Sequence, residues 1–219
     1  MIKLVIFDLD GTLLETVGDL AASCNAVLRS HGLPEHDYAA YRRFAGNGVR
    51  KLCERALPEA LRTEEQIDRV RDEFVAYYTA HIDCHSYAYE GIFDLLEELV
   101  ARGVKVAVVS NKFQQGTELL VQKFFPTTPF AAVFGNRPEV PLKPDPAADF
   151  EVLERTGVSP YEALHVGDTA SDIRAAKAAG IGAVGVSWGF RSREELLEAG
   201  ADVVIDHPRE LLDLLSKKK

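Results

Sequence analysis

Short apolar runs alternate with helical patterns over most of this 219-residue chain. Six runs have the length and composition of buried strands, at residues 4–7, 104–109, 131–134, 163–166, 183–186 and 203–205. Between most of them, apolar residues recur three and four positions apart, at 92–101, 117–124, 147–155, 173–179 and 193–198. This alternation predicts an α/β fold with a Rossmann-like, mostly parallel sheet covered by helices on both faces.

One segment departs from the alternation. Residues 17–83 contain helical patterns at 20–31, 48–56 and 64–81 but no convincing strand. The simplest organisation is a helical cap inserted after the first strand. We therefore predict an α/β core formed by residues 1–15 and 85–219, and a helical cap formed by residues 16–84.

Composition limits the possible partners and the compartment. The chain carries 25 Lys and Arg against 34 Asp and Glu, a net charge of −9, which disfavours nonspecific nucleic-acid binding. The only concentrated basic run is the tail at 217–219, and no stretch is apolar enough to cross a bilayer. The three cysteines form no CxxC pair, and the N-terminus has no secretory pattern. We expect a cytoplasmic protein, monomeric or homodimeric, that binds neither nucleic acid nor membrane.

Polar and charged residues gather directly after the predicted strands. In open α/β sheets, ligands bind at the carboxyl ends of the strands, so these side chains are expected to lie together. The set is Asp8 and Asp10 after the first strand, Ser110, Asn111 and Lys112 after the second, Lys143 in a proline-rich loop, and Asp168 and Asp172.

Four carboxylates at one sheet edge would repel one another unless a cation lay between them. Oxygen ligands without His or Cys favour Mg²⁺, which commonly also contacts a substrate phosphate. A carboxylate can attack phosphorus to form an aspartyl-phosphate. One of the pair Asp8 and Asp10 would then be the metal ligand and nucleophile, and the other would transfer protons.

Phosphoryl transfer also needs groups that position and neutralise the phosphate. Lys143 would neutralise phosphate oxygens, and Ser110 and Asn111 would donate hydrogen bonds to them. Gly11 allows a sharp turn after the first strand. Thr12 is a further candidate beside the phosphate, where its hydroxyl can hydrogen-bond back to the loop.

The order of these motifs resembles the haloacid dehalogenase superfamily of phosphatases. An apolar strand is followed by DLDGT, then SN, then a K-P loop, then GDTxxD, and the insert resembles the α-helical cap type. The stretches FDLDGTLLET, GNGVRKL, SNK, GNRPEVPLKPDP and VGDTASDI resemble the phosphoglycolate phosphatase branch. One departure is Glu90, where relatives commonly have Pro before the glycine.

The resemblance implies a role for each motif residue. Asp8 would be the nucleophile and Asp10 the acid and base. Mg²⁺ would be held by Asp8, by the backbone carbonyl of Asp10 and by Asp168, with Asp172 supporting it. Ser110, Asn111 and Lys143 would hold the phosphoryl group.

The cap loop FAGNGVRK, residues 44–51, is the candidate for substrate selection. Its glycines flank Asn47 and allow close approach to a ligand, and Arg50 can pair bidentately with a carboxylate. Arg50 is therefore the first candidate to bind the carboxylate of phosphoglycolate. The other candidates in the cap are Arg42, Arg43 and Lys51.

Structural interpretations stand beside these functional ones. Asp10-Gly11 alone is typical of a turn, Ser110-Asn111 of a helix cap, and Asp172 of an acid at a helix N-terminus. An arginine such as Arg50 on a cap helix is most often a solvated charge. Trp188 and Phe190 either line the pocket or pack beneath it.

The motifs together favour a Mg²⁺-dependent phosphatase that acts on a small phosphorylated metabolite, with 2-phosphoglycolate as the first candidate. The alternatives within the fold are a phosphosugar mutase, a pyrophosphatase or a nucleotide phosphatase. The alternative from another class is a non-catalytic binding protein. A protein of that class could lose Asp8 or Asp10, and this chain retains both.

Overall fold

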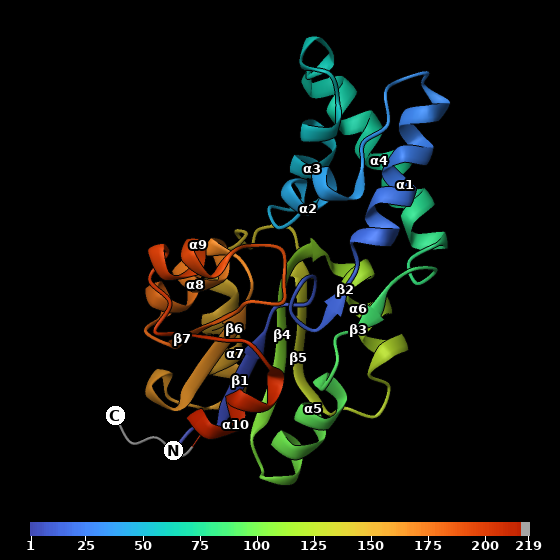
Figure 1. Ribbon diagram of the computed structural model, residues 1–219. Helices are drawn as coiled ribbons and strands as arrows, with labels where there is room; N and C mark the ends of the chain where they lie inside the picture. Colours follow the sequence, from blue (N-terminus) through green and yellow to red (C-terminus); the bar gives the residue numbers. More distant parts are fainter. Residues whose placement is uncertain (216–219) are drawn as a thin grey trace.

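The computed structural model describes residues 1–215, so the basic run at 217–219 lies outside the described residues. Its centre is a six-stranded sheet in the order β5-β4-β1-β6-β7-β8, in which every pair of neighbours is parallel (Figure 1). The strands are β1 (Leu4–Phe7), β4 (Lys105–Phe113), β5 (Phe130–Asn136), β6 (Ala163–Gly167), β7 (Gly182–Val186) and β8 (Val203–Ile205). The predicted α/β fold with a Rossmann-like sheet is confirmed.

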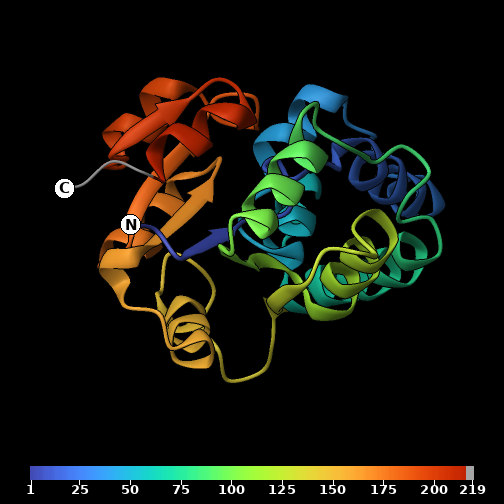
Figure 2. The ribbon, with the colours of Figure 1, turned by 90° about the horizontal axis from the view of Figure 1, so that it is seen from below.

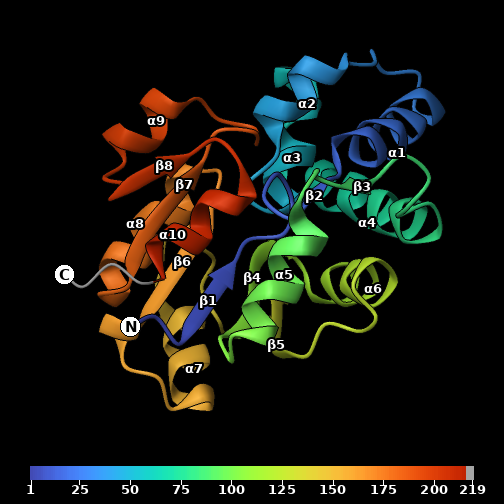
Figure 3. The ribbon, with the colours of Figure 1, turned by 60° about the horizontal axis from the view of Figure 1, so that its bottom comes forward.

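Helices cover both faces of this sheet, and β1 shows why. Its side chains alternate between two buried clusters, because successive residues of a strand point to opposite faces. Val5 and Phe7 belong to one cluster with α5 (Ile92–Ala101), α6 (Gln114–Phe124) and α10 (Leu211–Leu214). Leu4 and Ile6 belong to the other with α7 (Ala147–Thr156) and α8 (Ala170–Ala179). The continuous apolar sequence of β1 therefore reflects burial on both sides (Figure 3).

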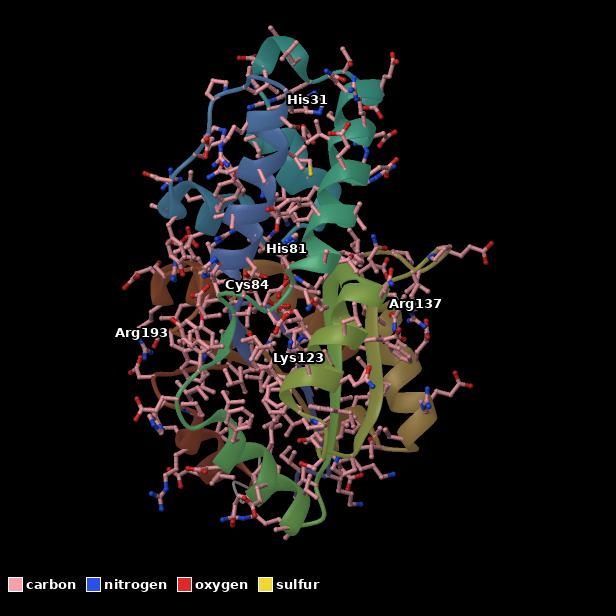
Figure 4. All side chains as sticks on the ribbon, turned by 90° about the vertical axis from the view of Figure 1, so that its right-hand side faces the viewer. His31, His81, Cys84, Lys123, Arg137 and Arg193 are labelled. Carbon is pink, nitrogen blue, oxygen red and sulfur yellow. The ribbon has the colours of Figure 1, made fainter. Side chains whose placement is uncertain are left out.

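Four helices form a layer above the carboxyl ends of the strands (Figure 1). They are α1 (Val17–Ser30), α2 (Tyr38–Phe44), α3 (Val49–Ala56) and α4 (Glu64–Ala80). The apolar cluster that begins under β1 continues into this layer through Leu13, Val17 and Leu20. In Figure 4, His31 lies at the far end of the layer, whereas His81 and Cys84 lie at its base. The chain begins at the opposite edge of the sheet (Figures 1 and 2).

Several short elements complete the fold. The strands β2 (Leu14–Glu15) and β3 (Tyr87–Ala88) pair antiparallel where the chain enters and leaves the helical layer. The helix α9 (Arg193–Glu198) packs against β7 and β8. Three 3₁₀ helices span Glu59–Leu61, Pro160–Glu162 and Pro208–Glu210. Within residues 1–215, no helix is both long and apolar enough to span a membrane.

The structure differs from the sequence-based expectation mainly at element boundaries. The strand predicted at 104–109 continues as β4 to Phe113, so Ser110, Asn111 and Lys112 lie in the strand rather than after it. The elements α2, α10, β2 and β3 were not predicted. All four are seven residues or shorter, too short to establish a hydrophobic period of their own.

Candidate active site

Asp8 directly follows β1, at the edge of the sheet that faces the helical layer, and Asp10 lies two residues further on. Gly11 makes the turn between them and the next strand possible. Its φ is 86°, and a Cβ atom there would lie 2.3 Å from the carboxylate Oδ2 of Asp168. Only glycine fits both the left-handed backbone and this close approach.

The carboxylate of Asp8 lies in a buried ionic network. Lys143 Nζ donates to Asp8 Oδ1 at 2.9 Å and to the carbonyl of Val109 at 2.5 Å, and it lies 2.7 Å from Asp172 Oδ1. Burial raises the pKa of Asp8 to about 6, although Lys143 opposes this effect. The pKa of Asp172 is shifted in the opposite direction. Burial would raise it, but the charges of Lys143 and His165 outweigh the burial and lower this pKa.

Four further hydrogen bonds hold the carboxylates of Asp172 and Asp168. Asp172 Oδ2 accepts from the backbone N–H and the hydroxyl of Thr169, the N-cap residue of α8. Asp172 is thus a helix N-terminal acid and also a partner of Lys143. Asp168 accepts from the Thr12 hydroxyl at 3.3 Å and from the Phe190 N–H at 2.7 Å.

Asp8, Asp168 and Asp172 form a group that can hold a metal ion. One oxygen from each lies within 4.8 Å of the others, and all three residues are buried. Burial and the charges of Asp172 and Asp8 raise the pKa of Asp168 well above its ordinary value. Lys143 supplies one positive charge for three carboxylates, so the group is short of positive charge. An all-oxygen donor set with this deficit fits a hard divalent cation such as Mg²⁺.

A second buried pair lies beneath this network. His165 Nδ1 lies 2.7 Å from Asp149 Oδ1, and both side chains are fully buried. His165 Nε2 lies 3.8 Å from Asp172 Oδ1. Burial favours the neutral imidazole, but Asp149 outweighs it and raises the pKa of His165 to about 9. The ionic network therefore continues from Asp8 to α7, which carries Asp149.

The surroundings of Asp10 are different, because they include the helical layer. Asp10 Oδ1 accepts from the Thr16 hydroxyl at 2.8 Å, just before α1. Lys112 Nζ donates to both Asp10 oxygens, at 3.1 and 3.3 Å, and to the Tyr78 hydroxyl at 2.8 Å. Tyr78 belongs to α4, so one ammonium joins the sheet, Asp10 and the helical layer.

A small cavity of about 40 Å³ lies at Asp8 and Asp10, between the sheet edge and the helical layer. Ser110, Asn111 and Lys112 line it from β4. The apolar part of the wall comes from Leu20, Ala45, Val49, Leu52, Phe74 and Phe113.

The structure divides the residues expected to bind phosphate. Ser110 lines the cavity, and its hydroxyl accepts from the Lys112 N–H at 3.3 Å. The Asn111 amide instead donates to the carbonyls of Gly46 and Lys143, at 3.1 and 3.0 Å, and accepts from the Lys143 N–H. Thr12 is fully buried against Asp168. The side-chain amide of Asn111 and the hydroxyl of Thr12 therefore position neighbouring groups, Asn111 also lines the cavity, and the phosphate contacts of both stay predictions.

The cap loop approaches the site with its backbone rather than with its charged side chains. Gly46, Gly48 and Val49 line the cavity, and Gly48 has a φ of 81°. Arg50 does not line it: its guanidinium pairs with Glu64 and, at 3.2 Å, with Asp68 on α4.

Other candidates from the sequence also lie outside the cavity lining. Asn47 accepts a hydrogen bond from Arg55 at 2.9 Å. Lys51 pairs with Glu54, and Arg42 contacts Glu15 and the ring of Phe190. Trp188 Nε1 donates to the Thr12 carbonyl at 3.1 Å, a packing role beneath the loop.

Sequence reasoning placed Lys112 in the set of residues after the strands without giving it a role, and it missed Thr16, Tyr78 and the pair His165–Asp149. A signal for Lys112 was present, because residues i and i+2 of a strand share a face and Ser110 was already a candidate. Tyr78 and Asp149 gave no such signal. Their partners are 34 and 16 residues away along the chain.

Comparison with known proteins agrees with this geometry. Residues 5–186 match the model of the family described as haloacid dehalogenase-like hydrolase. The chain is 35% identical over 213 residues to phosphoglycolate phosphatase of Pseudomonas putida, covering 96% of this chain and 78% of the relative. It is also 35% identical to phosphoglycolate phosphatase of Mesorhizobium japonicum, covering 93% and 90% of the two chains. A crystal structure of a predicted phosphoglycolate phosphatase from Haemophilus somnus superimposes with a TM-score of 0.90 at 30% identity, covering 97% of each chain.

Proposed function

Because the chain belongs to the haloacid dehalogenase-like hydrolases, we propose that it is a Mg²⁺-dependent phosphatase whose principal substrate is 2-phosphoglycolate. The observation that carries the proposal is the pair Asp8 and Asp10 at one cavity. Asp8 is held by Lys143 in a group able to bind a metal ion, and Asp10 is held separately by Thr16 and Lys112.

The geometry supports a two-step transfer. A carboxylate oxygen of Asp8 attacks phosphorus, and the bond from phosphorus to the bridging oxygen breaks. Asp10 gives its proton to the leaving alkoxide. Water then attacks the aspartyl-phosphate, Asp10 takes a proton from it, and Asp8 is regenerated. The products are the alcohol and inorganic phosphate.

The charged groups divide the work of stabilising this transfer. Asp8, Asp168 and the backbone carbonyl of Asp10 would hold Mg²⁺, with Asp172 supporting it. When bound, Mg²⁺ would neutralise charge on the phosphoryl oxygens. Lys143 keeps Asp8 ionised and oriented, and Ser110 donates its hydroxyl hydrogen to a phosphoryl oxygen. This assignment leaves Asn111 and Thr12 to position the surrounding loops.

Two features support a small substrate. The cavity is small, about 40 Å³, while the helical layer is in its present position, which disfavours a large substrate. The relatives with about 35% identity are named phosphoglycolate phosphatases, and phosphoglycolate carries only a two-carbon acid on its phosphate. Residues 16–84 would act as the cap that closes over this substrate, and residues 1–15 and 85–219 as the catalytic core.

The free state of the cysteines is consistent with a cytoplasmic location. Cys24, Cys53 and Cys84 are free thiols, and two of them are buried. Free thiols are typical of a reducing compartment. Their state supports a cytoplasmic location for the proposed enzyme.

The test is phosphate release from a panel of phosphorylated compounds, with and without Mg²⁺. The panel contains 2-phosphoglycolate, hexose phosphates, nucleotides and pyrophosphate. We expect Mg²⁺-dependent release with the highest kcat/KM for 2-phosphoglycolate. Equal or greater efficiency with a hexose phosphate or a nucleotide would contradict the substrate. Absence of release from every compound by the folded, Mg²⁺-loaded protein would contradict the phosphatase itself.

A further inference from the structure

We infer that Lys112 binds the carboxylate of the substrate and so selects for a short acid ester. This inference rests on the proposed function and assigns the second anionic group of the substrate to a residue of the sheet. The expectation from the sequence placed that role on Arg50 of the cap.

The Lys112 ammonium lies at the wall of the cavity. Lys112 is 7% exposed, and it lines the cavity beside Asp8, Asp10 and Ser110. Its Nζ has Asp10 and the Tyr78 hydroxyl as acceptors, and the Tyr78 ring lies 4.4 Å away. An ammonium has three N–H donors, and the two oxygens of the Asp10 carboxylate, at 3.1 and 3.3 Å, can share one of them as a bifurcated hydrogen bond. With a second N–H directed to Tyr78, the third can be donated to a carboxylate in the cavity.

The charge of the cavity wall also favours Lys112. Among residues 1–215, Lys112 is the one Lys or Arg that lines this cavity, and much of the remaining wall is apolar. A carboxylate transferred into such a space needs an ionic partner, because its desolvation is otherwise uncompensated. Lys143 is not that partner, since its Nζ already contacts Asp8, Asp172 and the carbonyl of Val109.

The length of the proposed substrate fits the distance between Asp10 and Lys112. Asp10 would protonate the bridging oxygen, and Lys112 Nζ lies 3.1 Å from Asp10 Oδ2. In phosphoglycolate, two covalent bonds separate the bridging oxygen from the carboxylate carbon. A group that contacts Asp10 is therefore at the right distance to contact the carboxylate as well. In a phosphate ester of a longer acid, the carboxylate would lie beyond the reach of the Lys112 ammonium.

The binding experiment uses two phosphonates that the enzyme cannot hydrolyse, measured by calorimetry in the presence of Mg²⁺. 3-Phosphonopropionate has the carboxylate of the substrate, and propylphosphonate has a methyl group in its place. We expect the protein to prefer the carboxylate by roughly 10- to 100-fold, as a charged hydrogen bond provides. In Lys112→Met the preference should fall below about 3-fold. Lys177→Met, which removes an exposed lysine on α8, should keep it.

The turnover experiment separates carboxylate binding from an effect on Asp10. Loss of Lys112 should lower kcat for every substrate, because Lys112 also contacts Asp10. The informative quantity is the ratio of kcat/KM for 2-phosphoglycolate to that for ethyl phosphate, which lacks the carboxylate. We expect this ratio to fall at least 10-fold in Lys112→Met and in Lys112→Gln. Thermal unfolding of each variant checks that it is folded.

The outcomes distinguish this inference from the proposed function. If both kcat/KM values fall equally and the phosphonate preference persists, Lys112 positions Asp10 only and the inference is overturned. If the preference is lost in Arg50→Ala instead, the cap binds the carboxylate. If the unmodified protein neither prefers 3-phosphonopropionate nor hydrolyses 2-phosphoglycolate, the proposed substrate fails together with the inference.

Discussion

The surroundings of Asp8 and Asp10 differ although the two residues are neighbours in the sequence. Asp8 belongs to a buried network that runs through Lys143, Asp172 and His165, all carried by the sheet or by the segments that follow its strands. Asp10 is held by Thr16 and by Lys112, and Lys112 also contacts Tyr78 on α4. One carboxylate is thus built into the core, whereas the position of the other depends on the helical layer.

This difference suggests how the two steps of the reaction are controlled. The contacts of Asp8, the proposed nucleophile, and of Asp172 lie at the sheet edge, so we expect their positions not to depend on the helical layer. The position of Asp10, the proposed proton donor, should depend on that layer, because Tyr78 of α4 contacts Lys112. Substitutions in the network around Asp8 should therefore affect both catalysis and the stability of the fold. Substitutions around Asp10 should mainly affect the reaction rate and the substrate preference.

The largest effect is expected for Asp8→Asn. The amide cannot form the acyl-phosphate, so kcat should fall by at least about 10⁴-fold, as for loss of other catalytic nucleophiles. The fold should persist, because the substitution also removes one of several neighbouring buried carboxylates. Phosphate release and circular dichroism test the two statements. Near-normal Mg²⁺-dependent activity would contradict the assignment of Asp8 as the nucleophile.

Lys143→Met should reduce stability as well as activity. It leaves Asp8 and Asp172 buried without their shared partner, and breaking a buried ion pair costs about 3–5 kcal/mol. Urea unfolding of the metal-free protein measures this loss, with Lys177→Met as the control for an exposed ion pair. Added Mg²⁺ should restore part of the stability by binding the same carboxylates. Equal unfolding midpoints for the two variants would show that the network is not stabilising.

His165→Gln should change how stability depends on pH. Asp149 raises the pKa of His165 to about 9 in the folded protein, against 6.5 for an unperturbed imidazole. The stabilisation is therefore complete below pH 6.5 and is lost as the pH rises through 9. At about 1.4 kcal/mol per pKa unit, the difference between 6.5 and 9 amounts to roughly 3–4 kcal/mol.

The measurement for His165 is the free energy of unfolding of the metal-free protein between pH 6 and pH 9.5. The difference between the unmodified protein and His165→Gln should shrink as the pH rises. Asp149→Asn should also weaken the pH dependence, because it removes the charge that raises the pKa of His165. A difference that stays constant across this range would mean that His165 is neutral throughout.

The smallest effect is expected for Arg50→Ala. Arg50 pairs with Glu64 and Asp68 and does not line the cavity, and partly exposed ion pairs of this kind contribute about 0–1 kcal/mol. The kcat/KM for 2-phosphoglycolate should change by less than about 3-fold. Steady-state kinetics measure this change. A selective rise in KM for 2-phosphoglycolate would indicate that Arg50 of the cap, rather than Lys112, binds the substrate carboxylate.

The sequence alone predicted the α/β fold and the arrival of Asp8, Ser110, Lys143 and Asp168 at one edge of the sheet. Both predictions rest on short-range patterns, namely the period of apolar residues and polar groups placed directly after strands. The boundary of β4 was wrong by four residues, since the apolar run ends at Val109 whereas the strand continues through the polar residues Ser110–Lys112 to Phe113.

Only the tertiary structure decided what each polar side chain contacts. In the folded chain, Arg50 pairs with Asp68 on α4, and the Asn111 amide donates to the carbonyls of Gly46 and Lys143 in two different loops. Lys112 donates to the Tyr78 hydroxyl. It also joined His165 to Asp149 in a fully buried pair. These partners come from separate elements, and long side chains can reach several acceptors. Their choice depends on how the elements pack, which the spacing of residues along the chain does not encode locally.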